Sequence, residues 1–317
     1  MFDLLKQLTP VQSPSGHELS VSEKIEEIAR KYGEVSHDAM GNLIVHKPGN
    51  GERVMLAGHM DSIGFIVTYI EKEGFARVCT LGGVRLPYAI GQRVIFNNGV
   101  VGVVCVDANI EPQNVTIEHV YIDTAGQTVG IGDTATFLGE SILSGDRIIS
   151  QYIDNRAGCA ILLKALQGLQ DSDIDLYVAF TVQEEVGCRG SAPAAFAVMP
   201  DVAVTVDICG AGDLPCDPGK NPLKLGEGPV VTLMDRMHIS HPAVAGRLID
   251  AAEEAGVPYQ RFVEVRGGTD TGTIAQTRGG VPAACMSICA RYVHTHNEMA
   301  SLSDCENCVT ILVKAFS

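Results

Sequence analysis

The chain has 317 residues, of which 46% are hydrophobic and 19% are charged, and its formal net charge is −15. This length exceeds what one hydrophobic core usually serves, so we expect one large domain and one smaller domain. The acidic charge disfavours nucleic acid and anionic membranes as partners.

The N-terminal residues show no secretory pattern, and no apolar run is long enough to cross a bilayer. The ten cysteines lie mostly within apolar runs, which is typical of small buried side chains in a reducing compartment. We therefore expect a cytoplasmic protein. Cys305 and Cys308 form a lone CxxC pair without further ligands nearby, so we interpret them as residues of a C-terminal helix rather than as a zinc site.

The predicted elements change character twice along the chain. A helix is expected after Ser15 and Gly16, and strands are expected at 43–45 and 54–57. Residues 65–137 instead show short, Val-rich runs, with a hairpin signal at Asn97-Asn98-Gly99. Alternating strands and helices return after about residue 147, with helices expected at about 156–166, 242–255 and 303–315.

This pattern predicts an α/β fold with a mostly parallel, helix-flanked sheet, because apolar strands alternate with helices. The main domain would comprise residues 1–64 and 147–317. A small β-rich, barrel-like domain would be inserted at residues 65–146.

Polar residues follow several predicted strands at the point where the apolar run ends. His59 and Asp61 follow one strand, Glu184 and Glu185 follow another, and Asp207 ends a third. In open α/β sheets, ligands bind beyond the carboxyl ends of the strands. These residues therefore predict one site that binds metal and activates water.

Each of these residues also has a plainer interpretation. Asp154 precedes a predicted helix and could serve as its N-cap. Glu184 and Glu185 could form a solvated strand end, although charge that directly ends an apolar strand calls for compensation. His294 and His296 both follow the last predicted strand, and spacing does not choose between them.

The predicted chemistry is hydrolysis at a pair of divalent cations. The proposed ligands suit two metals that share one bridge, and they are His59, Asp154, Glu185, Asp207 and His294. Nitrogen and oxygen ligands suit Zn²⁺, Co²⁺ or Mn²⁺. Metal binding lowers the pKa of water toward 7, and Glu184 would take the proton of that water and pass it to the leaving amine. Asp61 would hydrogen-bond a ligand and fix its orientation.

Five sequence blocks resemble the tetrahedral (TET) aminopeptidases, which are the co-catalytic dinuclear metallopeptidases of the glutamyl aminopeptidase family, sometimes labelled endoglucanase-M-like. The blocks occur in the order of that family and are Gly58-His59-Met60-Asp61, Ile153-Asp154-Asn155-Arg156-Ala157-Gly158, Gln183-Glu184-Glu185-Val186-Gly187, Val206-Asp207 and Arg291-Tyr292-Val293-His294-Thr295.

The resemblance implies an aminopeptidase with Asp154 bridging two metals, His59 and Asp207 completing one site, and Glu185 and His294 the other. It also implies Glu184 as general base and Asp61 as the orienting carboxylate. The inserted domain would make dimer contacts, and the protein would be a homo-oligomer between a dimer and a tetrahedral dodecamer. Gly268, Thr269 and Asp270 resemble a block near the substrate, although a turn with an N-cap at Asp270 is the plainer interpretation.

Short peptides are the expected substrates, trimmed from the N-terminus. The same site could instead hydrolyse an N-acyl substrate. A glycosidase is a further possibility because carboxylates are paired, but an aromatic content of 5% and the lack of Trp supply few sugar-stacking surfaces. A binding scaffold with a vestigial site is the non-enzymatic alternative, and the complete ligand set argues against it.

Overall fold

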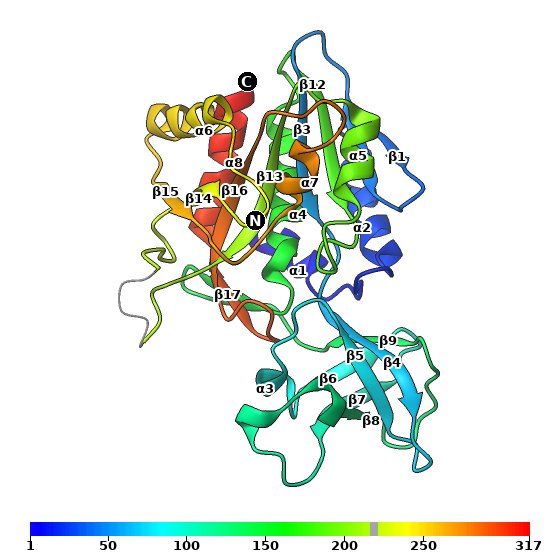
Figure 1. Cartoon of the computed structure of the whole chain (residues 1–317). Helices are drawn as coiled ribbons and strands as arrows, with labels where there is room; N and C mark the ends of the chain where they lie inside the picture. Colours follow the sequence, from blue (N-terminus) through cyan, green and yellow to red (C-terminus); the bar gives the residue numbers. More distant parts are fainter. Residues whose placement is uncertain (216–220) are drawn as a thin grey trace.

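The computed structural model describes residues 1–215 and 221–317. These residues form two units, a large α/β unit and a small β-barrel that lies below it in Figure 1. The chain enters the barrel after β3 (Arg53–His59) and returns to the large unit at β10 (Ile142–Ser144) and β11 (Arg147–Ser150). The barrel is therefore an insertion within the large unit.

The centre of the large sheet is parallel. Four neighbouring strands run in one direction, in the order β12 (Asp175–Thr181), β3, β13 (Val202–Gly210) and β16 (Ala283–Arg291). Their carboxyl ends therefore meet at one edge of the sheet. Further strands pair antiparallel at both sides of this centre, namely β1 (Glu34–His37) and β2 (Leu43–Lys47) next to β12, and β17 (Glu298–Ser301), β11 and β10 next to β16. A branch of β14 (Val230–Met234) and β15 (Gln260–Val263) also joins β16.

Helices cover both faces of this sheet (Figure 1). The central strands are buried on both faces, which explains why their sequences are continuously apolar rather than alternating. One face packs against α4 (Ile153–Gly168) and α8 (Leu302–Phe316), together with α1 (Phe2–Leu8), α2 (Leu19–Ala29) and α6 (Pro242–Ala255). The other face packs against α5 (Ser191–Val198) and α7 (Asp270–Ala275).

The inserted unit is a closed antiparallel barrel around its own apolar core, to which Phe65, Phe96 and Val104 contribute. Gly99 lies in the hairpin turn with φ of +85°, a left-handed conformation that glycine adopts without steric cost. The strand order is β4 (Gly64–Ile70), β5 (Ala76–Leu81), β8 (Val120–Asp123), β7 (Val101–Val106), β6 (Arg93–Phe96) and β9 (Thr134–Phe137), with short helical turns α3 (Leu86–Ala89), η1 (Pro112–Asn114) and η2 (Ile117–His119) between them.

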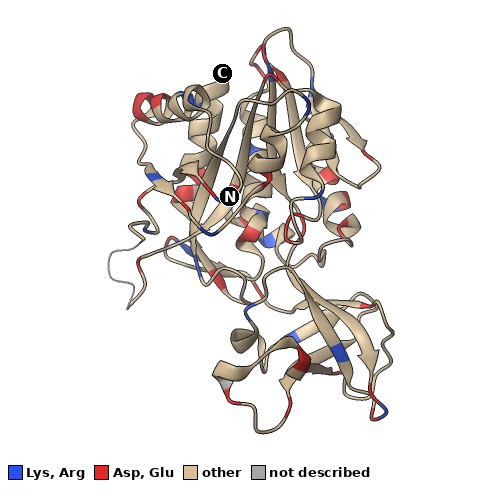
Figure 2. Cartoon of the chain, in the orientation of Figure 1, with Lys and Arg blue, Asp and Glu red and all other residues tan. Residues whose placement is uncertain are grey.

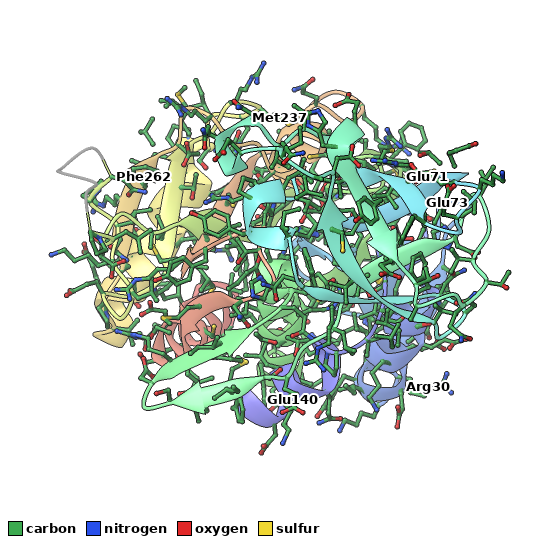
Figure 3. All side chains as sticks on the ribbon, turned by 90° about the horizontal axis from the view of Figure 1, so that it is seen from below. Arg30, Glu71, Glu73, Glu140, Met237 and Phe262 are labelled. Carbon is green, nitrogen blue, oxygen red and sulfur yellow. The ribbon has the colours of Figure 1, made fainter. Side chains whose placement is uncertain are left out.

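Asp and Glu residues occur along the ribbon of both units, in keeping with the net charge of −15 (Figure 2). Seen from below, the barrel lies in front of the α/β unit, with Glu71 and Glu73 at its edge (Figure 3). Within residues 1–215 and 221–317, every helix is too short or too polar to cross a membrane.

The predicted fold class is confirmed: a helix-flanked α/β sheet carries an inserted barrel. Parallel pairing is found among the four central strands and between β14 and β15, whereas the other strands of the large sheet pair antiparallel. We propose that the barrel corresponds to the inserted domain expected at residues 65–146. Strand β10 lies within that range but pairs with β11 in the large sheet. The short helix α1 was not predicted.

The cysteines of the described residues are free thiols. Cys305 and Cys308 lie fully buried on α8, within the core of the large unit, as the helical interpretation predicts. Cys105 and Cys209 are only half-buried, so not every cysteine in an apolar run is a core residue.

Candidate metal centre

The predicted site residues come together at the carboxyl edge of the parallel strands. They share one pocket of about 800 Å³ that opens between the strand ends and the loops near residues 235 and 267. His59 ends β3, Asp207 belongs to β13, and Asp154 lies at the start of α4. The pocket wall includes all of the proposed ligands and Glu184, namely His59, Asp154, Glu184, Glu185, Asp207 and His294.

Asp154 lies between two groups of potential ligands, with one carboxylate oxygen facing each. Its Oδ1 is 3.2 Å from His59 Nε2, and its Oδ2 is 3.3 Å from His294 Nε2. Asp207 Oδ1 is 3.6 Å from His59 Nε2, and Glu185 Oε2 is 3.2 Å from His294 Nε2. The side chains therefore form two groups of three that share Asp154, as a bridging carboxylate would require.

Apart from the two histidines, no basic side chain of the described residues compensates the charge of these carboxylates. Among the described residues, no Lys or Arg forms an ion pair with Asp154, Glu185 or Asp207, all of which are buried or half-buried. Arg156 is buried nearby, but its guanidinium donates to the backbone carbonyls of Leu8 and Met60. Buried carboxylates without counter-charge are costly, so this site favours the binding of cations.

Two further observations fit divalent cations. Burial lowers the pKa of His294, but the charges of Glu185 and Asp154 outweigh this effect and raise that pKa to about 11. The carboxylates thus attract positive charge strongly, and a cation would provide it while leaving the imidazole neutral. Glu185 Oε1 is buried and has no hydrogen-bond partner among the described residues, so it is available to a cation.

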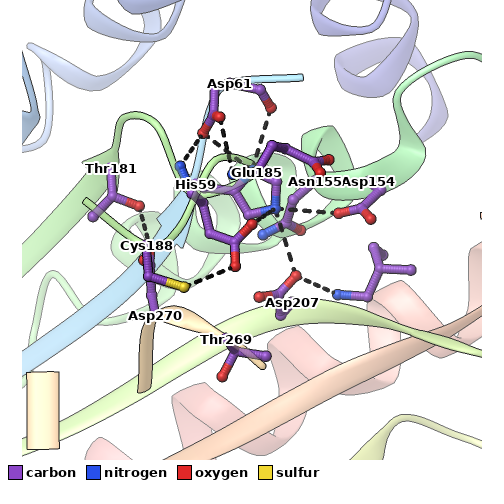
Figure 4. A network of polar contacts seen from close by, with 12 residues as sticks. His59, Asp61, Asp154, Asn155, Thr181, Glu185, Cys188, Asp207, Thr269 and Asp270 are labelled. Carbon is purple, nitrogen blue, oxygen red and sulfur yellow. Dashed lines mark hydrogen bonds and ion pairs between the residues drawn. The ribbon is translucent and has the colours of Figure 1, made fainter. Parts of the chain in front are cut away.

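Asp61 holds the surroundings of the site in place. Its Oδ1 lies 3.4 Å from His59 Nδ1, the ring nitrogen that faces away from Asp154. Its two oxygens also accept hydrogen bonds from the backbone N–H groups of Glu184, at 3.0 Å, and Glu185, at 3.2 Å, and from the Ser15 hydroxyl at 2.6 Å. One fully buried carboxylate therefore contacts His59 at the end of β3 and the backbone that follows β12 (Figure 4).

Asn155, not Asp154, makes the capping contact at the start of α4. Its Oδ1 accepts a hydrogen bond from the N–H of Gly158 at 2.9 Å, and its Nδ2 donates to the carbonyl of Val206 at 2.8 Å. Asp154 has non-helical backbone angles, and its side chain points toward the histidines instead. The plainer interpretation of Asp154 as an N-cap is therefore wrong.

Glu184 lies beside the two groups of ligands. Its Oε2 is 3.8 Å from His59 Nε2, and its Oε1 lies 3.2 Å from the Cys188 thiol. Burial raises the pKa of Glu184 well above the usual range of a carboxyl; the charge of His59 opposes this, and Asp207 and Asp270 add to it. A raised pKa makes a carboxylate a stronger base.

The block at residues 268–270 forms part of the pocket wall and the start of α7. Gly268 and Thr269 line the pocket. Thr269, rather than Asp270, is the N-cap of α7, because its side chain accepts a hydrogen bond from the N–H of Thr271. Asp270 is buried behind the pocket, where it accepts a hydrogen bond from Thr181.

The structure distinguishes the two candidate histidines. His294 reaches Asp154 and Glu185, whereas the ring of His296 lies against Phe137 of the barrel, 6.1 Å between ring centroids. Gly83 contributes to the position of His294, because a Cβ at residue 83 would lie only 2.7 Å from His294 Nδ1. A residue in the inserted segment thus packs directly against a proposed ligand.

Glu298 is a buried acidic residue to which the sequence analysis assigned no role. Its Oε2 accepts a hydrogen bond from the N–H of Asp154, and its Oε1 accepts one from the N–H of His294, both at 2.8 Å. The side chain is 1% exposed, on the short strand β17. In the sequence, the one feature that could have indicated this role is an acidic residue at the start of the segment Glu298–Ser301, which forms a mostly buried strand.

We expect Glu298→Gln to weaken cation binding. The amide would turn one of the two acceptors into a donor that opposes a backbone N–H, so Asp154 or His294 would shift. Loss of such a supporting contact typically lowers metal affinity by about 10–100-fold. Metal retained during titration with a chelator would measure the effect, and Glu306→Gln, at an exposed position of α8, is the matched control. Equal retention in both variants would contradict this role.

The chain is similar to known proteins over nearly its whole length. Residues 41–311 match the M42 glutamyl aminopeptidase family. A relative from Acetivibrio thermocellus is 44% identical, over 99% of this chain and 98% of its own. Aminopeptidase APDkam598 from the archaeon Desulfurococcus kamchatkensis has a similar structure, with a TM-score of 0.94 and 33% identity over 99% of this chain and 93% of its own. The TET1 peptidase of Pyrococcus horikoshii, which can assemble into a tetrahedron or a large octahedral shell, has a TM-score of 0.88 and 28% identity over 99% of this chain and 98% of its own. This chain belongs to the M42 glutamyl aminopeptidase family, and it is a peptide-bond hydrolase.

Proposed function

We propose that the protein is a metal-dependent aminopeptidase that removes N-terminal residues from short peptides. The observation that carries this proposal is the position of Asp154, whose two oxygens face His59 and His294. One cation would be held by His59, Asp154 and Asp207, and a second by Asp154, Glu185 and His294.

The ligand atoms are nitrogen and oxygen without thiolate, which suits Zn²⁺, Co²⁺ or Mn²⁺. When bound, a pair of such ions supplies Lewis-acid activation of water and of the scissile carbonyl.

Glu184 would act as the general base and then as the general acid. Its carboxylate lies at the side of the ligands and in the pocket wall, where it can accept a proton from water and transfer it to the leaving amine. Asp61 would be a positioning residue, since it orients His59 and holds the N–H of Glu184.

The pocket offers space for the substrate beside these groups. Its volume of about 800 Å³ lies in the range of small-molecule sites and suits a short peptide end. Gly268 and Thr269 belong to the wall and would contact the substrate, whereas the buried Asp270 would act from behind it. Thr269 is held in place by a 3.0 Å hydrogen bond from its hydroxyl to Asp235 Oδ2.

Glu184→Gln should keep its bound metal and lose most of its turnover. The amide preserves the size of the side chain but accepts no proton, and general base catalysis is typically worth about 10²–10⁴-fold. Metal content by elemental analysis and kcat on a fluorogenic aminoacyl substrate would test this. Glu227→Gln, at an exposed site away from the pocket, is the control. Wild-type kcat in the Glu184 variant would rule out the assigned role.

Substrate panels should separate the aminopeptidase from the related deacylase. We expect aminoacyl amides with a free amine to be hydrolysed and their N-acetylated counterparts to be spared. A chelator should abolish the activity, and added Zn²⁺, Co²⁺ or Mn²⁺ should restore it. Preference for the acetylated substrates would favour the deacylase, and activity that resists chelation would contradict the metal mechanism.

We also propose a homo-oligomer in the cytoplasm, built from dimers and extending up to a tetrahedral dodecamer. The barrel is the proposed dimer surface, because β7 alternates and leaves Val101 and Val103 exposed at 44% and 38%. Tyr69 and Tyr88 are also exposed large side chains of the inserted segment. Exposed apolar side chains of this kind are typical of contact surfaces.

The double variant Val101→Asp and Val103→Asp should form a smaller particle than the unmodified protein, because two charges would be buried at the contact. Light scattering coupled to size-exclusion chromatography measures the mass. Leu19→Asp is the control, because Leu19 is also an exposed apolar residue but lies on α2 of the large unit. An unchanged mass in the barrel variant would place the contact elsewhere.

A further inference from the structure

A third group of potential ligands lies beside the two already described. Glu184, Cys188 and Asp270 each offer a ligand atom, and these atoms lie within 4.8 Å of one another. Cys188 and Glu184 belong to the pocket wall, so a solute in the pocket can reach them. Figure 4 shows Cys188 above Asp270, with the sulfur directed toward a carboxylate. None of the proposed ligands of the two cations belongs to this group.

Asp270 is incompletely satisfied in its buried position. The residue is 1% exposed, and its Oδ2 accepts a hydrogen bond from the Thr181 hydroxyl. Its Oδ1 is buried without a hydrogen-bond partner in the part of the chain that the structure describes. A buried carboxylate oxygen without a partner is costly, and a cation in this group would remove that cost.

The sulfur atoms indicate which cations would bind. The thiol of Cys188 lies 3.2 Å from Glu184 Oε1, and the thioether of Met237 is 4.0 Å from the same thiol. Thiolate and thioether ligands favour soft or borderline cations over Mg²⁺ or Ca²⁺. Cys188 also has a φ of +51°, which non-glycine residues rarely adopt. In this conformation the thiol lies against the Glu184 carboxylate.

We propose that Cys188, Glu184 and Asp270 form a third, inhibitory site for a thiophilic divalent cation such as Zn²⁺ or Cd²⁺. The cation would form bonds to the Cys188 sulfur and to one carboxylate oxygen each of Glu184 and Asp270. The thiol proton would leave to solvent, since a thiol must be deprotonated to bind a metal. Water from the pocket would complete the coordination, with the Met237 thioether close by.

The inhibitory consequence rests on the proposed function. A Glu184 carboxylate that is bound to this cation no longer accepts a proton from water. At low concentration, the cation would therefore support activity by binding to the two groups of ligands that share Asp154. An excess of the cation would suppress activity by binding to the third group, Glu184, Cys188 and Asp270.

The test uses the full-length protein loaded with its two resident cations and then titrated with Cd²⁺. A thiolate bound to Cd²⁺ absorbs in the ultraviolet by charge transfer, whereas the ligands of the other two groups carry no sulfur. This absorption therefore reports on cysteine ligation directly, without reference to activity. Cys188→Ser keeps a hydroxyl donor near Glu184 but removes the sulfur. Cys209→Ser is the matched control, because Cys209 lines the same pocket.

We expect one further equivalent of Cd²⁺ to bind with this absorption in the unmodified protein and in the Cys209 variant, but not in the Cys188 variant. The Zn²⁺ or Cd²⁺ concentration for half-inhibition should rise about tenfold or more in the Cys188 variant, by analogy with the loss of a supporting metal contact. The absorption and the inhibition should follow the same concentration dependence.

The absence of a third equivalent, or an absorption that persists in Cys188→Ser, would overturn the site. Binding at Cys188 without loss of turnover would support the site and instead contradict the role of Glu184 as base. Failure of the inference and failure of the proposed function are thus distinguishable.

Discussion

The structure of the site depends on the burial of several carboxylates at one edge of the sheet without a lysine or arginine partner among the described residues. Asp154, Glu185 and Asp207 face two histidines, and no Lys or Arg in the described ranges forms an ion pair with them. Such a cluster opposes folding unless positive charge enters it. The arrangement of these side chains by the fold therefore favours cation binding, on which the proposed hydrolytic chemistry depends.

Two other buried carboxylates hold the backbone near the proposed ligands. Asp61 accepts hydrogen bonds from the N–H groups of Glu184 and Glu185, and Glu298 accepts them from Asp154 and His294. The contacts to Glu184, Glu185 and Asp154 join segments that are far apart in the sequence, whereas Glu298 lies four residues from His294. The backbone N–H groups of three proposed ligands, Asp154, Glu185 and His294, are therefore held by buried carboxylates.

The backbone at the site departs from ordinary conformations. Tyr152, Gln183 and His294 have positive φ angles of 59°, 55° and 65°. Each is a proposed ligand or lies within two residues of one. Positive φ in a non-glycine residue costs on the order of 1–3 kcal/mol and persists where the surrounding structure determines it. The apolar cores on the two faces of the sheet supply that support. The geometry of the site therefore depends on the rigidity of the sheet.

The sequence by itself determined the fold class and the candidate residues, because apolar runs that end in polar residues mark the carboxyl ends of buried parallel strands. It also located the inserted unit, because hydrophobic periodicity changes with secondary structure. Only the tertiary structure decided that Asp154 faces both histidines, that His294 rather than His296 reaches the site, and that Glu298 and Asp270 are buried beside it. These facts depend on strand order and side-chain direction, which arise from packing between distant segments and leave no local pattern in the sequence.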